Sequence, residues 1–145
     1  MGVVITDNSD AFLKRLEAAV DGPGGGLDTA TQFLAAKMRE SMPGAGAAVI
    51  QGTGGDTGVR ARYVASTPGS PPGVRTGQLR NSITNAKVDR LRWASGTNVA
   101  YAKHLEFGTA DMPARPFMRP ALRNNEAAIG RVFNAAVRRK MGGGT

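Results

Sequence analysis

Residues 83–95, ITNAKVDRLRWAS, decide the fold class that the sequence predicts. Residues 83–89 and 91–95 alternate in polarity as half-buried strands do, and a tight turn at Asp89 and Arg90 joins them. Trp93, the only tryptophan, is expected to anchor this hairpin against a helix. The stretch therefore predicts a small antiparallel sheet.

Helices are predicted on both sides of this hairpin. Asn8 or Ser9 can cap a first helix, and residues 27–41 form a second helix that Pro43 ends. The first helix carries an apolar stripe of Phe12, Leu16, Ala19 and Val20. Pro120 suits the first turn of a last helix that runs to about Lys140. One side of that helix is apolar, with Leu122, Ile129, Val132, Phe133 and Ala136.

Two short helical segments complete the regular structure. Thr76 is expected to cap a turn over residues 77–82. Residues 100–107 form a short helix that Gly108 closes. Tyr101, Leu105 and Ala102 are expected to face inward, and Tyr101, Leu105 and Phe107 to pack along one face of the helix. The fold class predicted is α+β, with a small antiparallel sheet packed against two to three helices.

The rest of the chain has little regular structure of its own. Residues 3–5 read as a short strand, and residues 141–145 as a frayed tail. Residues 43–75 are rich in Gly and Pro, and we expect a flexible arm or a long loop there, favouring a long extended arm that becomes ordered on a partner. With 145 residues, the chain is expected to form one domain over residues 1–145.

Composition excludes several classes of site. The chain has no Cys and one His, so a disulfide framework, a thiolate nucleophile and a site with two imidazoles are all excluded. The Gly-rich residues 52–58 lack the Lys-Ser/Thr of a phosphate-binding loop. No third group completes a catalytic set with His104 and Glu106. We therefore expect no cofactor, no metal and no enzyme activity.

The positive charge is concentrated in the second part of the chain. The net charge is +8, and residues 61–145 carry 14 of the 19 Lys and Arg residues but only four of the 11 Asp and Glu residues. This distribution indicates a face that meets a polyanion or an acidic partner, or simply exposed helix faces that keep the protein soluble. No signal peptide or membrane span is expected, because the apolar runs are short.

Three runs of sequence resemble the neck and tail-completion proteins of long-tailed bacteriophages, a family that includes tail terminators and head–tail joining proteins. The runs are residues 71–83 (PPGVRTGQLRNSI), 96–109 (GTNVAYAKHLEFGT) and 112–122 (MPARPFMRPAL). The resemblance covers residues 76–140 well and the first forty residues loosely.

The resemblance implies a virion protein at the head–tail junction, assembled in the cytoplasm of the bacterial host. It implies a homo-oligomeric ring, six-fold on the tail side rather than twelve-fold, with phage DNA passing through the lumen. Its partners would be copies of itself, head-closure or connector proteins and tail tube proteins, with no membrane. A ring needs two different patches on each subunit, which an acidic first half and a basic second half would supply. The candidate interface residues are Arg75, Arg80, Tyr101, His104, Glu106, Phe107, Arg115, Phe117 and Arg119.

Two alternatives stay open. Phe117, which follows the stiff Arg115-Pro116 pair, can also be an ordinary loop aromatic that packs into the core. The chain can also be a basic nucleic-acid-binding protein that acts in the host cell, with arginines on phosphates and Trp93 and Tyr101 as stacking faces.

Overall fold

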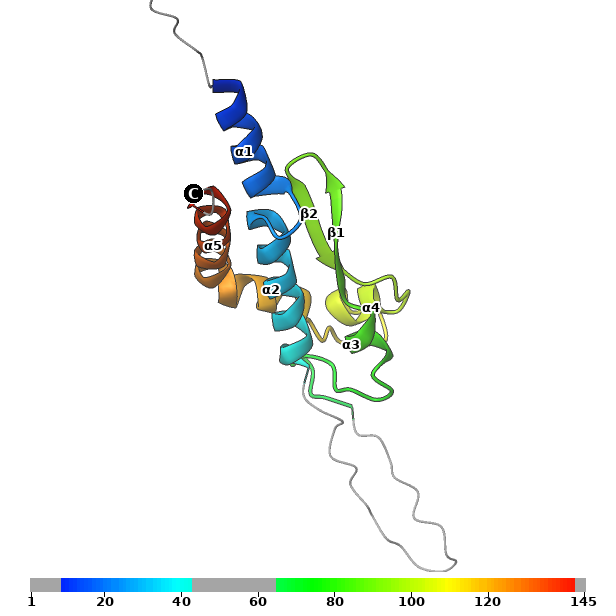
Figure 1. Ribbon diagram of the computed structural model, residues 1–145. Helices are drawn as coiled ribbons and strands as arrows, with labels where there is room; N and C mark the ends of the chain where they lie inside the picture. Colours follow the sequence, from blue (N-terminus) through cyan, green and yellow to red (C-terminus); the bar gives the residue numbers. More distant parts are fainter. Residues whose placement is uncertain (1–8, 43–64, 143–145) are drawn as a thin grey trace, which may run out of the picture. The chain divides into compact units, whose positions relative to one another are not determined.

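The structure, a computed structural model, describes residues 9–42 and 65–142 (Figure 1). The chain divides into two compact units, each made from segments that are distant in the sequence. Unit 1 takes Met1–Phe33, Asn85–Ser95 and Glu126–Thr145, and unit 2 takes Leu34–Thr84 and Gly96–Asn125. The prediction of one domain over residues 1–145 stays a prediction.

The fold is α+β, as the sequence predicted. The long helices are α1 (Ser9–Asp21), α2 (Gly26–Ser41) and α5 (Met118–Gly142), and the short ones are α3 (Gln78–Ser82) and α4 (Ala102–Phe107). The strands β1 (Thr84–Asp89) and β2 (Arg92–Gly96) form a two-stranded antiparallel sheet. The strand expected at residues 3–5 and the part of the arm at residues 43–64 lie outside the described residues.

Local sequence accounts for most element boundaries. Helix α5 begins two residues before Pro120, which therefore lies in the first turn, where its missing N–H costs nothing. The N-cap of α3 is Gly77 rather than the expected Thr76. The Thr76 hydroxyl still accepts a bond from the backbone N–H of Gln78 at 3.3 Å. Gly108, at a φ of 76°, closes α4 as predicted.

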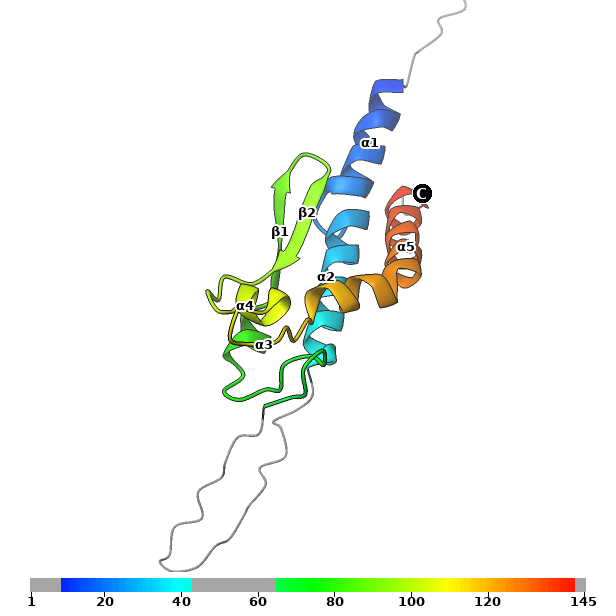
Figure 2. The same ribbon diagram turned by 180° about the vertical axis from the view of Figure 1, so that it is seen from behind.

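Unit 1 packs the hairpin and two helices around the start of α2. Figure 2 shows the hairpin alongside the corner between α1 and α2 and the end of α5 beside α2. Ser95 donates to the carbonyl of Thr31 at 2.7 Å, which ties β2 to α2. A Cβ on Gly26 would lie 2.6 Å from the side chains of Phe133 and Val137. The approach of α5 to α2 therefore requires glycine at this position.

Unit 2 has an apolar core built from four elements. Phe117 and Ile83 are fully buried, and around them pack Ala35, Met38, Met42, Leu79, Ala102 and Ala121. Arg39 of α2 donates to the carbonyl of Ile83, which joins α2 to the chain just before β1. The core therefore holds α2, α3, α4 and the start of α5 together.

Residues 65–75, the end of the segment predicted as a flexible arm or long loop, pack against other parts of unit 2. Gly69 donates to the carbonyl of Ala114 at 2.9 Å, and Pro72 is buried. Val74 packs against the core cluster. Proline-rich chain has few internal hydrogen bonds, so its order here comes from these contacts with residues far along the sequence.

Two apolar residues that were expected to face the core are exposed. Phe12 is 55% exposed, because the first turns of α1 extend beyond the hairpin turn (Figure 2). Leu122 is 47% exposed, whereas its neighbour Ala121 is buried. One residue is a rotation of about 100° around a helix, so Ala121 takes the core position and Leu122 faces away from it. In the part of the chain that the structure describes, no helix has both the length and the apolarity to cross a membrane.

Candidate interaction surface

The three runs that carry the family resemblance converge in unit 2. Leu79 and Ile83 come from the first run, Ala102 from the second, and Phe117 and Ala121 from the third. All five belong to one cluster of buried side chains. The runs therefore form a single structural framework, although up to 42 positions separate these members along the chain.

Glu106 links the second run to the third by capping α5. Its Oε2 accepts the backbone N–H groups of Phe117 at 2.8 Å and Met118 at 2.9 Å, and its Oε1 accepts that of Arg119 at 2.9 Å. The first N–H groups of a helix have no partner within it, and the N-terminal end of the helix dipole favours a negative charge. The side chain is 5% exposed. Glu106, which was predicted as an interface residue, therefore has a structural role inside unit 2.

Gly108 allows the chain to turn sharply after α4. A Cβ at this position would lie 2.9 Å from the backbone nitrogen of Ala114 and from the carbonyl oxygen of Met112. The turn that follows is closed by the N–H of Thr109, which donates to Met112 at 2.8 Å. This close approach and the positive φ together explain why the second run ends in Phe-Gly-Thr.

Phe107 and Arg119 form an exposed pair beside this cap. The Arg119 guanidinium lies 4.4 Å from the centre of the Phe107 ring, within the range of a cation–π contact. Phe107 is 62% exposed and Tyr101 is 42% exposed, so neither packs inward as predicted. The buried face of α4 is made by Ala102 and Glu106.

The nine candidate interface residues fall into three groups by their exposure. Phe117 and Glu106 are buried, so their side chains are not accessible to another molecule in this structure. Phe117 therefore packs into the core, as the alternative interpretation of this residue as a loop aromatic predicted. Arg115 is half-buried, and its Nε donates to the carbonyl of Ser66 at 3.0 Å. The exposed candidates are Arg75, Arg80, Tyr101, His104, Phe107 and Arg119.

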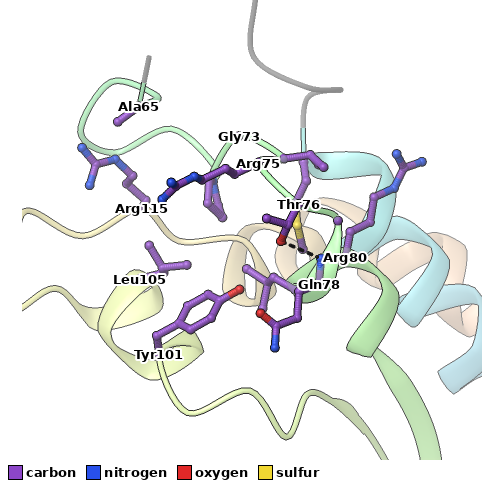
Figure 3. Close-up of a pocket in the computed structure, with 14 residues that line it drawn as sticks. Ala65, Gly73, Arg75, Thr76, Gln78, Arg80, Tyr101, Leu105 and Arg115 are labelled. Atoms are coloured by element: carbon purple, nitrogen blue, oxygen red, sulfur yellow. Dashed lines mark hydrogen bonds between the residues drawn. The ribbon is translucent and has the colours of Figure 1, made fainter. Parts of the chain in front are cut away.

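A groove in unit 2 brings several of these exposed residues together. Its volume is about 360 Å³, and it lies between the chain at residues 72–80 and the side chains of Tyr101, Leu105 and Arg115 (Figure 3). Sequence reasoning had grouped Arg75, Tyr101 and Arg115 as interface residues, but it gave no reason for a cavity between them. The groove arises because residues 65–75 pack back against unit 2.

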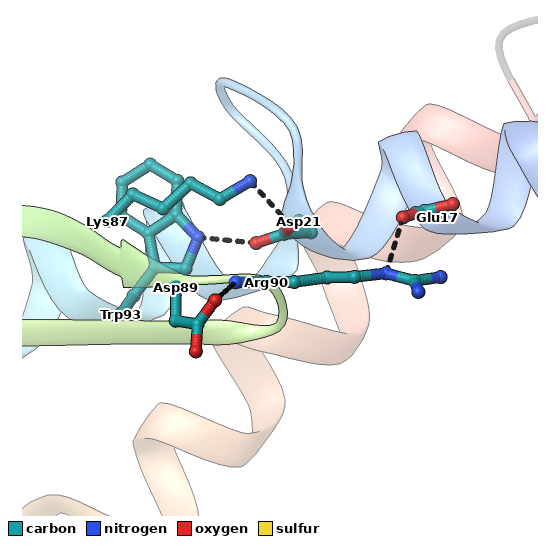
Figure 4. Close-up of polar contacts among 6 residues, drawn as sticks. All are labelled: Glu17, Asp21, Lys87, Asp89, Arg90 and Trp93. Atoms are coloured by element: carbon teal, nitrogen blue, oxygen red, sulfur yellow. Dashed lines mark hydrogen bonds and ion pairs between the residues drawn. The ribbon is translucent and has the colours of Figure 1, made fainter.

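Unit 1 contains a polar cluster that the sequence did not predict (Figure 4). Asp21, at the end of α1, accepts bonds from the Lys87 Nζ at 2.6 Å and the Trp93 Nε1 at 2.8 Å. The hydrogen bond from Lys87 holds the pKa of Asp21 below its ordinary value, burial opposes this shift, and the Trp93 bond adds to it. The cluster therefore joins the hairpin to α1, as the anchoring role of Trp93 required.

Other acidic residues of the first half are also used inside unit 1. Glu17 accepts from the Arg90 Nε at 2.9 Å. The Asp28 carboxylate, which is 8% exposed, accepts from Gly24, Gln32 and Asn85. Glu17, Asp21 and Asp28 thus bind groups of their own chain, and the two-patch hypothesis stays a prediction.

The acidic residues and the histidine that the structure describes do not gather into a metal site. No group of three or more His, Cys, Asp and Glu side chains among them is placed to hold a metal ion. His104 is exposed, and both oxygens of Glu106 already accept backbone hydrogen bonds.

The sequence contained a partial signal for the Glu106 cap. Glu106 precedes the Arg-Pro-Phe-Met-Arg-Pro segment that starts α5, and an acidic side chain can accept the free backbone N–H groups at the start of a helix. No local pattern, however, pairs Glu106 with Phe117, which lies 11 positions later in the sequence. The Asp21 cluster joins residues more than 60 positions apart and has no sequence signal.

Comparisons of the chain with protein-family models, with curated proteins and with solved structures found no match.

Proposed function

We propose that this chain is a structural protein of the head–tail junction of a long-tailed phage. It forms a ring that completes or terminates the tail and joins it to the head-side connector. The observation that supports this proposal is that the three runs resembling the neck family converge on one core and one helix cap.

The exposed residues of the runs supply a surface suited to assembly. Aromatic and arginine side chains are enriched at protein interfaces and often contribute most of the binding energy. Tyr101, Phe107 and Arg119 are exposed on unit 2, and the Phe107 ring is held by Arg119. In the proposed ring these residues contact the neighbouring subunit or the adjacent connector.

The mass of the assembled protein in solution tests this proposal. Native mass spectrometry and light scattering over a range of concentrations should find a closed ring, with a mass of about 91 kDa for six copies of the 15.1 kDa chain. F107S should weaken assembly without unfolding the monomer, because the Phe107 side chain is already largely exposed. Val88→Ser, a change at a similarly exposed apolar residue of the hairpin, is the matched control.

The location of the protein in particles provides the second arm of the test. Immunogold labelling of purified phage should place it at the junction of head and tail. A protein that stays monomeric at high concentration and is missing from purified particles is not a neck protein.

The alternative is a basic nucleic-acid-binding protein that acts in the host cell. The observation that favours it is the charge of unit 2, where Arg75, Arg80, Lys103, Arg119 and Arg123 are all exposed. Contacts with many phosphates weaken steeply as salt rises, whereas a ring held by apolar contacts persists. This alternative would be favoured if the protein stays monomeric at every salt concentration and its affinity for DNA falls steeply as salt rises.

A further inference from the structure

The groove of unit 2 combines an apolar floor with a cationic rim. Met42 and Leu79 are buried members of the core, and Val74 and Leu105 pack against that core. All four also line the groove, so a molecule in it would contact the outer side of the core. An apolar floor favours a ligand that buries an aliphatic or aromatic side chain there.

The charged residues that the structure describes around the groove all have the same sign. Three arginines, Arg75, Arg80 and Arg115, are among these described lining residues, and no described Asp or Glu is. Figure 3 shows the guanidinium groups of Arg75 and Arg115 at the same end of the cavity, whereas that of Arg80 points away from it. The bond from the Arg115 Nε to Ser66 fixes the direction of that guanidinium. One end of the groove is therefore suited to a carboxylate, which guanidinium groups bind in a well-defined geometry.

The size and shape of the groove restrict its ligand. About 360 Å³ is close to the lower limit of ~300 Å³ for ligand pockets, so it accommodates one or two side chains rather than a folded domain. Tyr101 and Leu105 form one wall, and Thr76 and Gln78 form the other (Figure 3). Such a narrow groove fits an extended chain, with an apolar side chain inside and its acidic neighbour at the arginine end.

We propose that this groove binds an extended acidic segment of a partner protein. An apolar side chain of the segment enters the cavity between Leu105 and Leu79, and a carboxylate beside it pairs with Arg75 and Arg115. This inference goes beyond the proposed function, because it holds whether or not the chain forms a ring.

Peptide binding to the full-length protein tests the proposal by fluorescence anisotropy. The labelled probe is Gly-Glu-Leu-Phe-Asp-Gly. Two comparison peptides each change one property: Gly-Gln-Leu-Phe-Asn-Gly removes the carboxylates, and Gly-Glu-Ser-Ser-Asp-Gly removes the apolar side chains. We expect the probe to bind roughly tenfold more tightly than either comparison peptide, because each loses one of the two matched features.

Variants of the protein locate the binding site. R75Q should weaken the probe by roughly threefold to tenfold, as expected for one ion pair at a partly exposed site. Arg123→Gln is the matched control, because it removes an exposed arginine that does not line this groove. Y101A should also weaken the probe, and it changes no charge. Circular dichroism of each variant separates lost binding from lost folding.

Several outcomes would overturn the proposal. Equal binding of the probe and the comparison peptides would show that the groove does not recognise the two matched features. An equal loss of probe binding in R123Q and R75Q would indicate diffuse attraction between charges. A short DNA duplex that displaces the probe and depends on Arg75 in the same way would assign the surface to nucleic acid. Binding that occurs only after deletion of residues 44–58 would assign the groove to the chain's own segment.

Discussion

Replacing Glu106 by glutamine should destabilise unit 2 although the side chain keeps its size. The glutamine oxygen can still accept the N–H groups of Phe117 and Met118, as Oε2 does now. Its amide nitrogen would then face the N–H of Arg119, and two donors cannot bond to each other. A hydrogen bond to a charged group is worth about 1.5–3 kcal/mol, and the charge at the helix N-terminus about 0.3–1 kcal/mol more. We therefore expect a loss of about 2 kcal/mol.

Glu106→Ala should cost more than Glu106→Gln. It removes the acceptor of all three N–H groups, and the side chain it deletes is buried. Water can partly hydrate the backbone N–H groups of Met118 and Arg119, because Arg119 is exposed. This hydration limits the loss of unfolding free energy. An unfolding free energy lower by about 3–5 kcal/mol is the expected result. Since small domains are stable by only ~5–15 kcal/mol, this change comes close to unfolding the protein.

Urea unfolding measured by far-UV circular dichroism provides the assay. A loss of 2 kcal/mol lowers the midpoint by roughly 1 M for a typical dependence on urea. Glu126→Gln is the matched control, because Glu126 is an exposed glutamate in the same helix. Unchanged midpoints for both Glu106 variants, or a glutamine variant less stable than the alanine variant, would refute the capping argument.

Three further predictions test other parts of the structure. The pKa of Asp21 is lowered by Lys87, so its carboxylate stabilises the fold above its unfolded pKa, and this contribution is lost as the pH falls through the folded pKa. The urea midpoint of the wild-type protein, followed by Trp93 fluorescence, should therefore fall more steeply below about pH 4 than that of Asp21→Asn. Gly26→Ala places a methyl group against Phe133 and Val137 and should cost about 1–3 kcal/mol in thermal unfolding; an unchanged Tm would contradict the close packing of α5 on α2. Phe117→Ala should lower the unfolding free energy by about 3–5 kcal/mol and Phe107→Ala by less than about 1 kcal/mol, because the first ring is fully buried and the second is 62% exposed. Equal losses in chemical denaturation would contradict the placement of Phe117 in the core and of Phe107 on the surface.

The elements that sequence predicted well are those specified locally. The hairpin follows from alternating polarity and a turn, and its observed strands differ from the predicted ones by one residue at their ends. The limits of α2 follow from the glycines before it and Pro43 after it. In each case the relevant forces act within a few residues, so the pattern alone carries the information.

The orientation of short elements could not be predicted in the same way. Helix α4 has six residues, fewer than two turns, so its apolar residues do not define a unique buried face. The inward position predicted for Ala102 is confirmed, whereas Tyr101 and Phe107 are exposed and Glu106 is buried in their place. A glutamate on the buried side becomes favourable only when the N-terminus of α5 meets it, and that is a tertiary event.

The buried and exposed residues of the three runs carry different kinds of information. Glu106, Gly108 and Phe117 are required by the cap, the turn and the core, so their presence in this pattern specifies how unit 2 folds. Arg75 and Tyr101 are exposed, and the core does not dictate their side chains. Function resides in such surface groups rather than in the framework that carries them. A chain that kept the first set and changed the second would therefore keep the fold of unit 2 and bind a different partner.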